Sequence, residues 1–229
     1  MSFIKPAKLA ALVFIALTGI VLPTHSQVVV YNSFGPGYAY NTGHWVVGGA
    51  SSPHGYQGHA EYFTPGISGY LSSVQLATYR QASGSGLSNF YIAQDNGSGT
   101  PGIILESFAS VLNVTGLLTL NSTVKPLLQA GTEYWLCDEP TASDSYNGWY
   151  ENNQGVTNGF AAESSEWGWY PAPAPVPING VSITDGVFRV SVTPVPEPSV
   201  VESGIMCGCC LLLFRWRKCN REKRLKRVV

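Results

Sequence analysis

The chain has 229 residues, of which 12% are charged and 45% are hydrophobic, and its formal net charge is -1. That average hides a segregation of sign. Between Gln27 and Pro198 twelve acidic residues stand against three basic ones, a net charge of about -9, whereas eight of the thirteen Lys and Arg residues fall in the last fifteen positions. An acidic body repels polyanions, so this composition argues against nucleic acid as a partner.

Residues 1-26 have the pattern of an export signal. Lys5 and Lys8 precede an apolar run from Leu9 to Leu22, and small residues follow up to Ser26. The run is shorter than the roughly 20 residues that a membrane span needs, which favours a signal peptide over a permanent N-terminal membrane helix. We expect the Sec translocon and signal peptidase as partners and cleavage after Ser26.

Residues 27-194 are predicted to form one all-β domain. Apolar and polar residues alternate along short segments separated by Gly, Pro and Asn, and no helical apolar stripe lasts three turns. We predict strands at residues 28-33, 59-63, 73-77, 89-93, 103-108, 117-120, 132-138, 159-163 and 188-193. The pattern is typical of an antiparallel β-sandwich with jelly-roll-like connections, because no helices are available for parallel crossovers. The Pro-rich stretch 171-177 is predicted to be a rigid loop before the last strand.

Cys137 is the one cysteine of the predicted domain, since the other four lie in the last 25 residues. The domain therefore has no internal disulfide, and a body of this length must be stabilised by its core. We expect Cys137 to be a buried strand residue; an intermolecular disulfide is the alternative.

The histidines of the body suggest a weak candidate metal site. His44, His54 and His59 could meet Glu61, but their spacing matches no known metal-binding motif, and solvated loop positions are favoured. The turn Asp95-Asn96-Gly97-Ser98-Gly99 offers oxygen ligands for calcium at Asp95 and Asn96. It is also the sequence that a β-hairpin needs, and we favour the hairpin.

Catalytic patterns are absent from the sequence: it contains no nucleophile elbow, P-loop, zinc-protease helix or dinucleotide fingerprint. A hydrolase using His59 with Glu61, or Glu163 with Glu166, is a remote alternative, and we expect no enzyme and no required cofactor.

Six aromatic residues lie between positions 149 and 170, interleaved with amide and carboxylate side chains. Exposed aromatic rings flanked by such groups bind sugars, because a pyranose offers apolar C-H faces and a belt of hydroxyls. This pattern makes Trp149, Trp167 and Trp169 candidate sugar-binding residues. The alternative, which we favour, is that the rings fill the core and its loop cover.

The C-terminal region, residues 195-229, begins with Pro196, Glu197 and Pro198, and a short apolar segment at about 200-214 follows. The basic tail of residues 215-229 opens with Arg215, Arg217 and Lys218. A positive flank stays on the cytoplasmic side of a membrane, so this order predicts a short membrane helix with a basic stop. A solvated tail or a nucleic-acid-binding arm is the alternative reading of the basic run.

This order of Pro-Glu-Pro, apolar segment and basic cluster resembles the PEP-CTERM sorting signal of Gram-negative bacteria. The resemblance implies an exosortase as partner, an inner-membrane intermediate, and delivery to the cell surface or to an exopolysaccharide matrix. Two features depart from the family pattern: the apolar segment is short and contains Glu202, and it is rich in cysteine.

Three segments of the body carry a second resemblance. GHAEYFTPGISGYLSSVQLATY (58-79), FYIAQDNGSGTPGIILESF (90-108) and LQAGTEYWLCDEP (128-140) are similar to β-sandwich ectodomains of the choice-of-anchor type, with type R nearest. That family implies an architecture and an address but no reaction. We therefore expect an exported structural or adhesive protein without catalytic activity, with a carbohydrate-binding module as the alternative.

Overall fold

A computed structural model describes residues 26-157, 159-164, 168-171 and 184-195. Nearly all of the predicted export signal lies outside these residues. So do the Pro-Glu-Pro motif, the apolar segment, the basic tail, and the side chains of Glu166 and Trp167. The described part of the chain includes no helix long and apolar enough to span a membrane.

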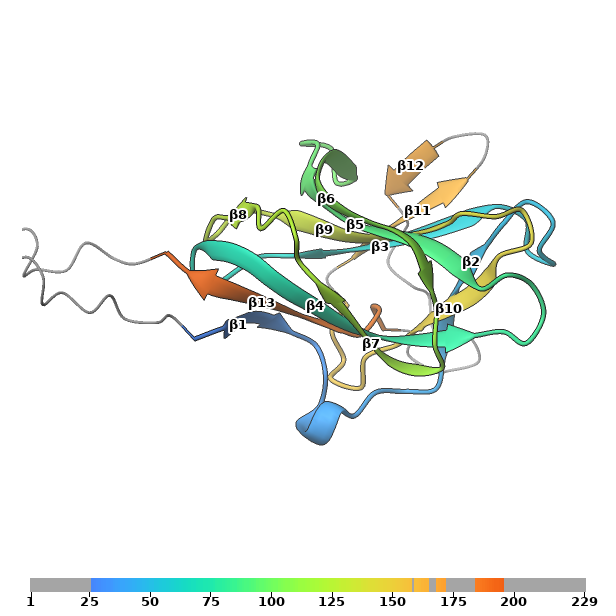
Figure 1. Ribbon diagram of the computed structural model, residues 1–229, viewed down its shortest axis with the longest axis horizontal. Helices are drawn as coiled ribbons and strands as arrows, with labels where there is room; N and C mark the ends of the chain where they lie inside the picture. Colours follow the sequence, from blue (N-terminus) through green and yellow to red (C-terminus); the bar gives the residue numbers. More distant parts are fainter. Residues whose placement is uncertain (1–25, 158, 165–167, 172–183, 196–229) are drawn as a thin grey trace, which may run out of the picture.

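The described residues form strands and one short 3-10 helix, η1 (Pro36–Tyr38) (Figure 1). The strands are β1 (Val28–Asn32), β2 (His44–Gly48), β3 (Gln57–Phe63), β4 (Gly69–Arg80), β5 (Leu87–Asp95), β6 (Pro101–Leu112), β7 (Gly116–Asn121), β8 (Leu127–Leu128), β9 (Tyr134–Pro140), β10 (Tyr146–Tyr150), β11 (Phe160–Ser164), β12 (Gly168–Pro171) and β13 (Phe188–Pro194).

Every pairing between these strands is antiparallel, and together they make one curled sheet with the path β1-β13-β4-β10-β2-β3-β9-β5-β6. Strand β4 connects much of it, because it pairs with β13, β10, β7 and β8. The link between β2 and β3 is a single residue pair, Gly48 with Gln57. The prediction of an all-β antiparallel domain is confirmed.

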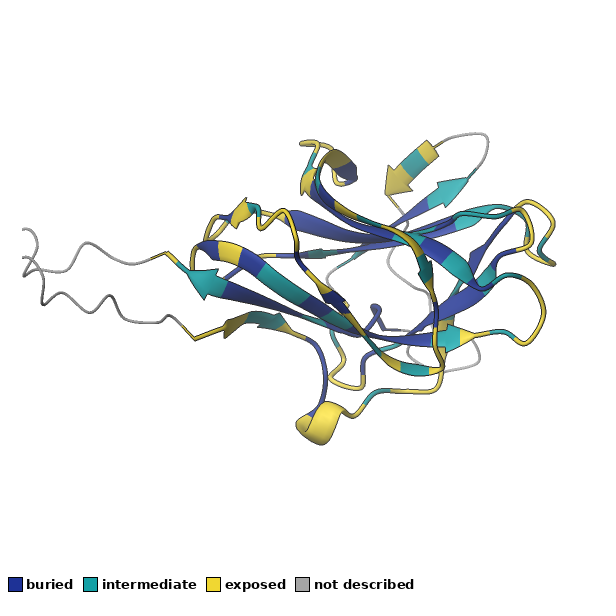
Figure 2. Cartoon of the chain, in the orientation of Figure 1, coloured by how far each residue is buried: buried dark blue, intermediate teal, exposed yellow. Residues whose placement is uncertain are grey.

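The main core lies inside the curl. Its residues come mainly from β3, β5 and β9 on one side and from β4, β10 and β13 on the other, and long stretches of these strands are buried (Figure 2). Phe63 of β3 reaches Phe188 of β13 with ring centroids 5.7 Å apart, and Trp149 of β10 meets the same ring at 5.7 Å. The domain has no internal disulfide, and burial of these aromatic side chains supplies much of its stability.

Four strands were not predicted: β2, β8, β10 and β12. Their sequences are short and lack a clear alternation; β10 reads YNGWY, and the structure buries residues 147-150 all in a row. What places β10 in the sheet is its pairing on both edges, with β2 and with β4, which a local pattern does not encode.

The two ends of the described chain lie side by side. Val28 of β1 pairs with Val192 of β13, so residues 26 and 195 leave the domain at the same end (Figure 1). The predicted export signal and the predicted sorting motif are therefore attached to one pole of the domain.

Candidate functional site

Trp149 is fully buried, so its prediction as a sugar-binding residue is wrong. Its indole N-H donates to the carbonyl oxygen of Val187 at 2.9 Å. Residues 146-150 form a strand between two others, and alternation along that strand turns the tryptophan inward. The alternative reading, core filling, holds for this residue.

A buried polar pair lies on the inward face of β3. His59 Nε2 is 2.7 Å from Glu61 Oε1, and each side chain is 1% exposed. Burial lowers the pKa of His59 to about 3, which keeps the ring neutral. Burial also raises the pKa of Glu61 well above its usual value, and nearby Asp185 adds to the rise. Trp45 stacks on one ring face of His59 at 5.0 Å.

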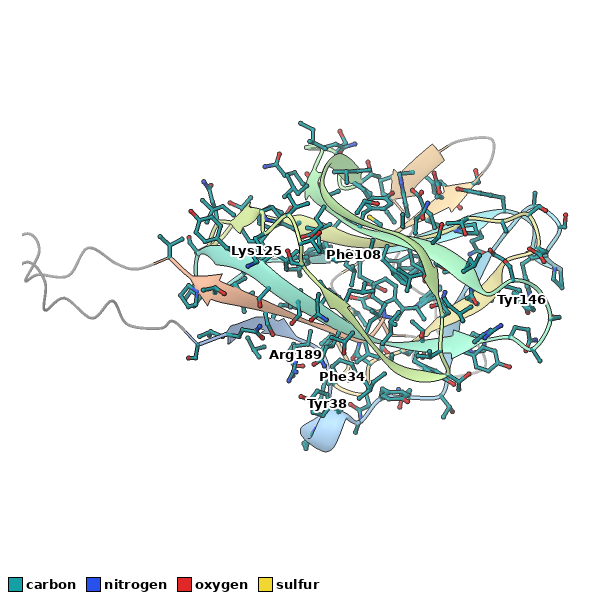
Figure 3. The ribbon with its side chains drawn as sticks, viewed as in Figure 1. Phe34, Tyr38, Phe108, Lys125, Tyr146 and Arg189 are labelled. Atoms are coloured by element: carbon teal, nitrogen blue, oxygen red, sulfur yellow. The ribbon has the colours of Figure 1, made fainter. Side chains whose placement is uncertain are left out.

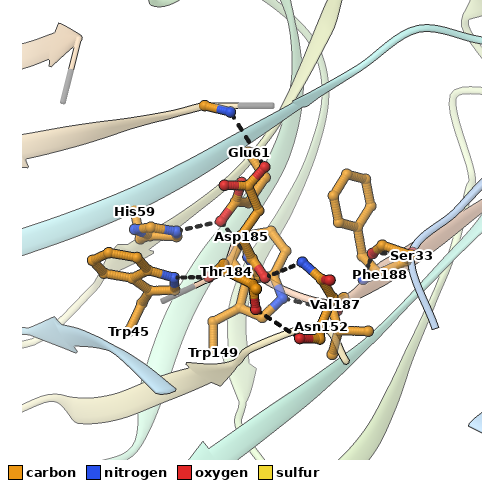
Figure 4. A network of polar contacts seen from close by, with 12 residues as sticks. Ser33, Trp45, His59, Glu61, Trp149, Asn152, Thr184, Asp185, Val187 and Phe188 are labelled. Atoms are coloured by element: carbon orange, nitrogen blue, oxygen red, sulfur yellow. Dashed lines mark hydrogen bonds and ion pairs between the residues drawn. The ribbon is translucent and has the colours of Figure 1, made fainter. Parts of the chain in front are cut away.

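This pair belongs to a network that fastens the segment before β13 to the sheet (Figure 4). The backbone N-H of Gly186 donates to Glu61 Oε1. Trp45 Nε1 donates to the carbonyl of Thr184 at 3.0 Å, and the Thr184 hydroxyl donates to the carbonyl of Asn152 at 2.6 Å. The contacts join strands far apart in sequence, and they make the His59-Glu61 pair part of the interior.

The candidate metal site of His44, His54, His59 and Glu61, which the sequence disfavoured, does not assemble. His44 is exposed on β2 and its ring lies 4.8 Å from Tyr79, while His54 is exposed in the connection before β3, 5.8 Å from the Tyr146 ring. Neither joins His59. Within the described ranges no three His, Cys, Asp or Glu side chains are grouped as a metal ion would require.

The Asp95 loop connects β5 and β6 as the predicted hairpin turn. Asp95 Oδ2 accepts from the N-H of Gly97 at 2.6 Å, and Asp95 Oδ1 accepts from the indole of Trp135 at 2.9 Å. Asn96 Oδ1 accepts from the N-H of Ser98 at 2.8 Å. A calcium ion would have to compete with these donors for the same oxygen atoms.

A second polar and aromatic group lies on the other face of the sheet from the main core. Here β5, β9, β3 and β11 carry a separate cluster built on Ala60, Tyr91, Cys137 and Ala161, with Trp169 of β12 packed against it. Cys137 is buried with a free thiol, as predicted. We call five residues at this place the outer site: Tyr56, Tyr91, Glu139, Glu163 and Trp169.

Strand register brings the two carboxylates of the outer site together. Glu163 of β11 pairs with Gly58 of β3 on one edge and with Trp169 on the other. Because His59 pairs with Asp138 of β9, the next position places Glu139 beside Gly58 on the opposite edge. The two glutamates thus flank a glycine, two strand spacings or about 10 Å apart at their Cα atoms.

A chain of hydrogen bonds holds these side chains. Tyr56 Oη donates to Glu163 Oε2 at 2.9 Å, and Tyr91 Oη donates to Glu139 Oε1. Trp169 Nε1 donates to Tyr91 Oη at 2.9 Å. Each carboxylate therefore has a phenol donor, and the indole of Trp169 is tied to the same chain.

The electrostatics of the outer site reflect partial burial and like charge. Burial and, to a lesser degree, neighbouring Glu139 together raise the pKa of Glu163 to about 7, while the Tyr56 hydrogen bond acts to lower it. Burial raises the pKa values of Tyr56 and Tyr91 far above the usual range, so both phenols keep their protons as donors.

The sequence considered Glu163 only with Glu166, which is close in the chain. The structure brings Glu163 to Glu139, 24 positions earlier, across an intervening strand. Glu166 and Trp167 lie outside the described residues. Trp169 is partly buried in the outer site, and its sugar-binding role stays a prediction. The segments of all three strands were predicted, but their pairing had no local signal.

Comparison with known proteins adds no relative: no protein-family model matches the chain, and a search of curated proteins finds no significant match.

Proposed function

We propose that this chain is an exported protein of the cell surface or extracellular matrix of a Gram-negative bacterium, and that its β-domain binds polysaccharide without cleaving it. The observation that carries the binding proposal is the outer site. It combines a partly buried tryptophan and two phenols with two carboxylates on one face.

The chemistry of this face suits a sugar. Aromatic rings pack against the C-H faces of a pyranose, and carboxylate oxygens accept hydrogen bonds from its hydroxyls. The N-H of Trp169 is already bonded to Tyr91, which holds the indole in one orientation and lowers the entropy that binding would cost.

Binding is favoured over hydrolysis by His59 and Glu61 because these two residues are poorly placed for catalysis. His59 and Glu61 are each 1% exposed, enclosed by Trp45 and Phe160, so a substrate has no access to them. A purely structural or adhesive role without sugar affinity is the second candidate. The pairing of β1 with β13 supports this second candidate, because it brings both ends of the domain to one pole, as suits a domain attached to the cell surface at a single point.

We also infer the finer architecture and the route of export. Two groups of strands enclosing one core support a β-sandwich with jelly-roll-like connections, as in choice-of-anchor domains. The export signal would engage the Sec translocon and signal peptidase, and Pro196, Glu197 and Pro198 would present the chain to an exosortase. Arg215, Arg217 and Lys218 would stop the apolar helix at the cytoplasmic side of the membrane. Mass spectrometry of the mature chain ends tests this route: intact termini on a cytosolic protein would overturn it.

Binding is tested with the purified full chain on a glycan array. We expect retention of a matrix polysaccharide, loss of at least about tenfold in affinity for Trp169→Ala, and no loss for Tyr70→Ala, an exposed aromatic on β4. Equal loss in both variants, or no binding by the parent, would favour the structural role.

A further inference from the structure

The outer site has a surplus of negative charge. Glu139 and Glu163 both accept hydrogen bonds from neutral phenols, and neither forms an ion pair with Lys or Arg among the described residues. Among the described residues the site therefore combines two carboxylates with neutral phenol and indole donors, and it contains no cationic side chain.

The basic residues of the domain are all elsewhere. Arg80 ends β4, Arg189 is on β13 and Lys125 lies between β7 and β8, so none is on the strands of the outer site. Arg189 lies over the Tyr38 ring at 4.7 Å (Figure 3), and its guanidinium also donates to Gln75 Oε1. The positive partner of two partly buried carboxylates must therefore come from outside the described chain, or the carboxylates must take up protons.

A ligand with an ammonium group would supply that partner. A charge-assisted hydrogen bond from N-H⁺ to a carboxylate is about twice as strong as a neutral one, and partial burial protects it from screening. The ring of Trp169 adds a surface on which a sugar can stack and to which a cation is attracted. An acidic glycan would meet repulsion from both glutamates and from the net negative domain.

We propose that the outer site recognises a glycan carrying free, protonated amino groups, that is, a polymer of deacetylated amino sugar. The inference rests on the proposed carbohydrate-binding function and specifies its ligand class. The amine donates to Glu163 and Glu139 while the ring stacks on Trp169. The raised pKa of Glu163, caused by burial and by nearby Glu139, supports it: an ammonium group beside this carboxyl favours the carboxylate form, and the proton leaves to solvent.

The test uses three oligosaccharides that share length and β-1,4 linkage and differ at C2: an oligomer of glucosamine, one of N-acetylglucosamine and one of glucose. Affinity is measured calorimetrically with the purified full chain at pH 6 and low salt, where the amine is charged. We expect the glucosamine oligomer to bind at least about tenfold more tightly than the other two, a preference that falls as salt rises.

Variants connect the preference to the site. Glu163→Gln and Glu139→Gln keep the shape and the phenol hydrogen bonds, and each should reduce the preference for the glucosamine oligomer to less than about threefold. Glu133→Gln is the matched control: it removes the same charge from an exposed position just before β9, about 20 Å from Glu139, and should leave the preference unchanged. Circular dichroism confirms that each variant is folded; if one is not, the oligosaccharide series on the parent still decides.

The results distinguish the amino-sugar inference from the broader proposal of carbohydrate binding. Equal binding of all three oligomers, or tighter binding of the acetylated or neutral one, overturns the amino-sugar inference and leaves carbohydrate binding in place. Binding of none of the three, together with an empty glycan array, overturns both. A preference that drops equally in Glu133→Gln shows attraction to the overall charge of the domain, and also overturns the assignment to this site.

Discussion

Glu163 of β11 stands directly opposite Gly58 of β3, and its carboxylate occupies the space where a side chain at position 58 would begin. A Cβ added to Gly58 would lie 2.9 Å from Glu163 Oε2 and 3.1 Å from Glu163 Cβ. The glycine is thus what lets a glutamate on one side of β3 approach another glutamate on the far side.

Gly58→Ala should therefore displace Glu163 without deleting any polar group. We expect a loss of about 1 to 3 kcal/mol in the free energy of unfolding from overpacking, and loss of glycan affinity comparable to that of Glu163→Gln. Urea unfolding and calorimetric binding measure the two effects. Gly66→Ala is the control, because a Cβ there meets no atom within 4 Å and should change neither. Unaltered glycan affinity in Gly58→Ala would count against the outer site.

The two tryptophans of the described aromatic segment should separate stability from binding. Trp149→Phe removes a buried indole and its hydrogen bond to Val187, and should cost about 1 to 3 kcal/mol of stability with glycan affinity retained. Trp169→Phe should change stability by less than about 1 kcal/mol and weaken glycan binding, since its indole N-H no longer orients Tyr91. The reverse pattern would contradict both assignments.

Replacements of Glu61 should behave as those of an interior residue. Glu61→Gln keeps an oxygen for the N-H of Gly186 and should alter the free energy of unfolding by about 1 kcal/mol or less. Glu61→Ala strands that donor and His59 in the interior and should cost about 3 kcal/mol or more. Chemical denaturation distinguishes the two. If either variant remained fully folded but bound glycan with altered affinity, the buried His59-Glu61 network would have a role at the outer site.

Asp138 of β9 should make stability depend on pH. Its pKa is raised to about 7, mainly by burial and also by nearby Glu139, while a hydrogen bond from Ser88 acts to lower it. The unfolded value is about 3.9, so between those pH values the folded chain holds a proton that the unfolded chain has released. This group's contribution therefore falls as pH rises from about 4 to about 7, and it stays low above that.

His59, across the strand pair from Asp138, has the opposite slope. Its pKa is about 3 when folded and about 6.5 when unfolded, so its contribution falls as pH drops below about 6.5. Asp138→Asn removes only the pH dependence that comes from Asp138 and leaves the one that comes from His59. We expect the variant to be more stable than the parent at pH 8 and equal to it near pH 4, by urea unfolding at both values. A variant that is less stable at pH 8 would show that the Asp138 carboxylate is stabilised by its surroundings.

Much of the domain could be predicted from local pattern. The alternation of Phe188, Val190 and Val192 with polar residues placed a strand whose three apolar side chains are all fully buried in the main core. The Asp95 turn was recognised because Asn and Gly accept the backbone angles of a hairpin, and Gly97 has φ 84°. These features depend on residues a few positions apart.

The function of Trp149 and the partner of Glu163 could not be predicted in this way. Whether an aromatic side chain faces water or core depends on which strands lie on each side of its own, and β10 gave no alternation that would show this. Glu139 and Glu163 meet because two strands pair with opposite edges of β3 in particular registers, with a glycine between them.

The sequence by itself determined the class of the domain, the absence of a disulfide from residues 27-194, the separation of acidic body from basic tail, and the order of segments that predicts export. Those are properties of composition and short-range periodicity. Only the tertiary structure decided which acidic and aromatic side chains share a face, because strand order and register are set by packing between segments distant in the chain, and a register change of one residue would turn each of these side chains to the other side of the sheet.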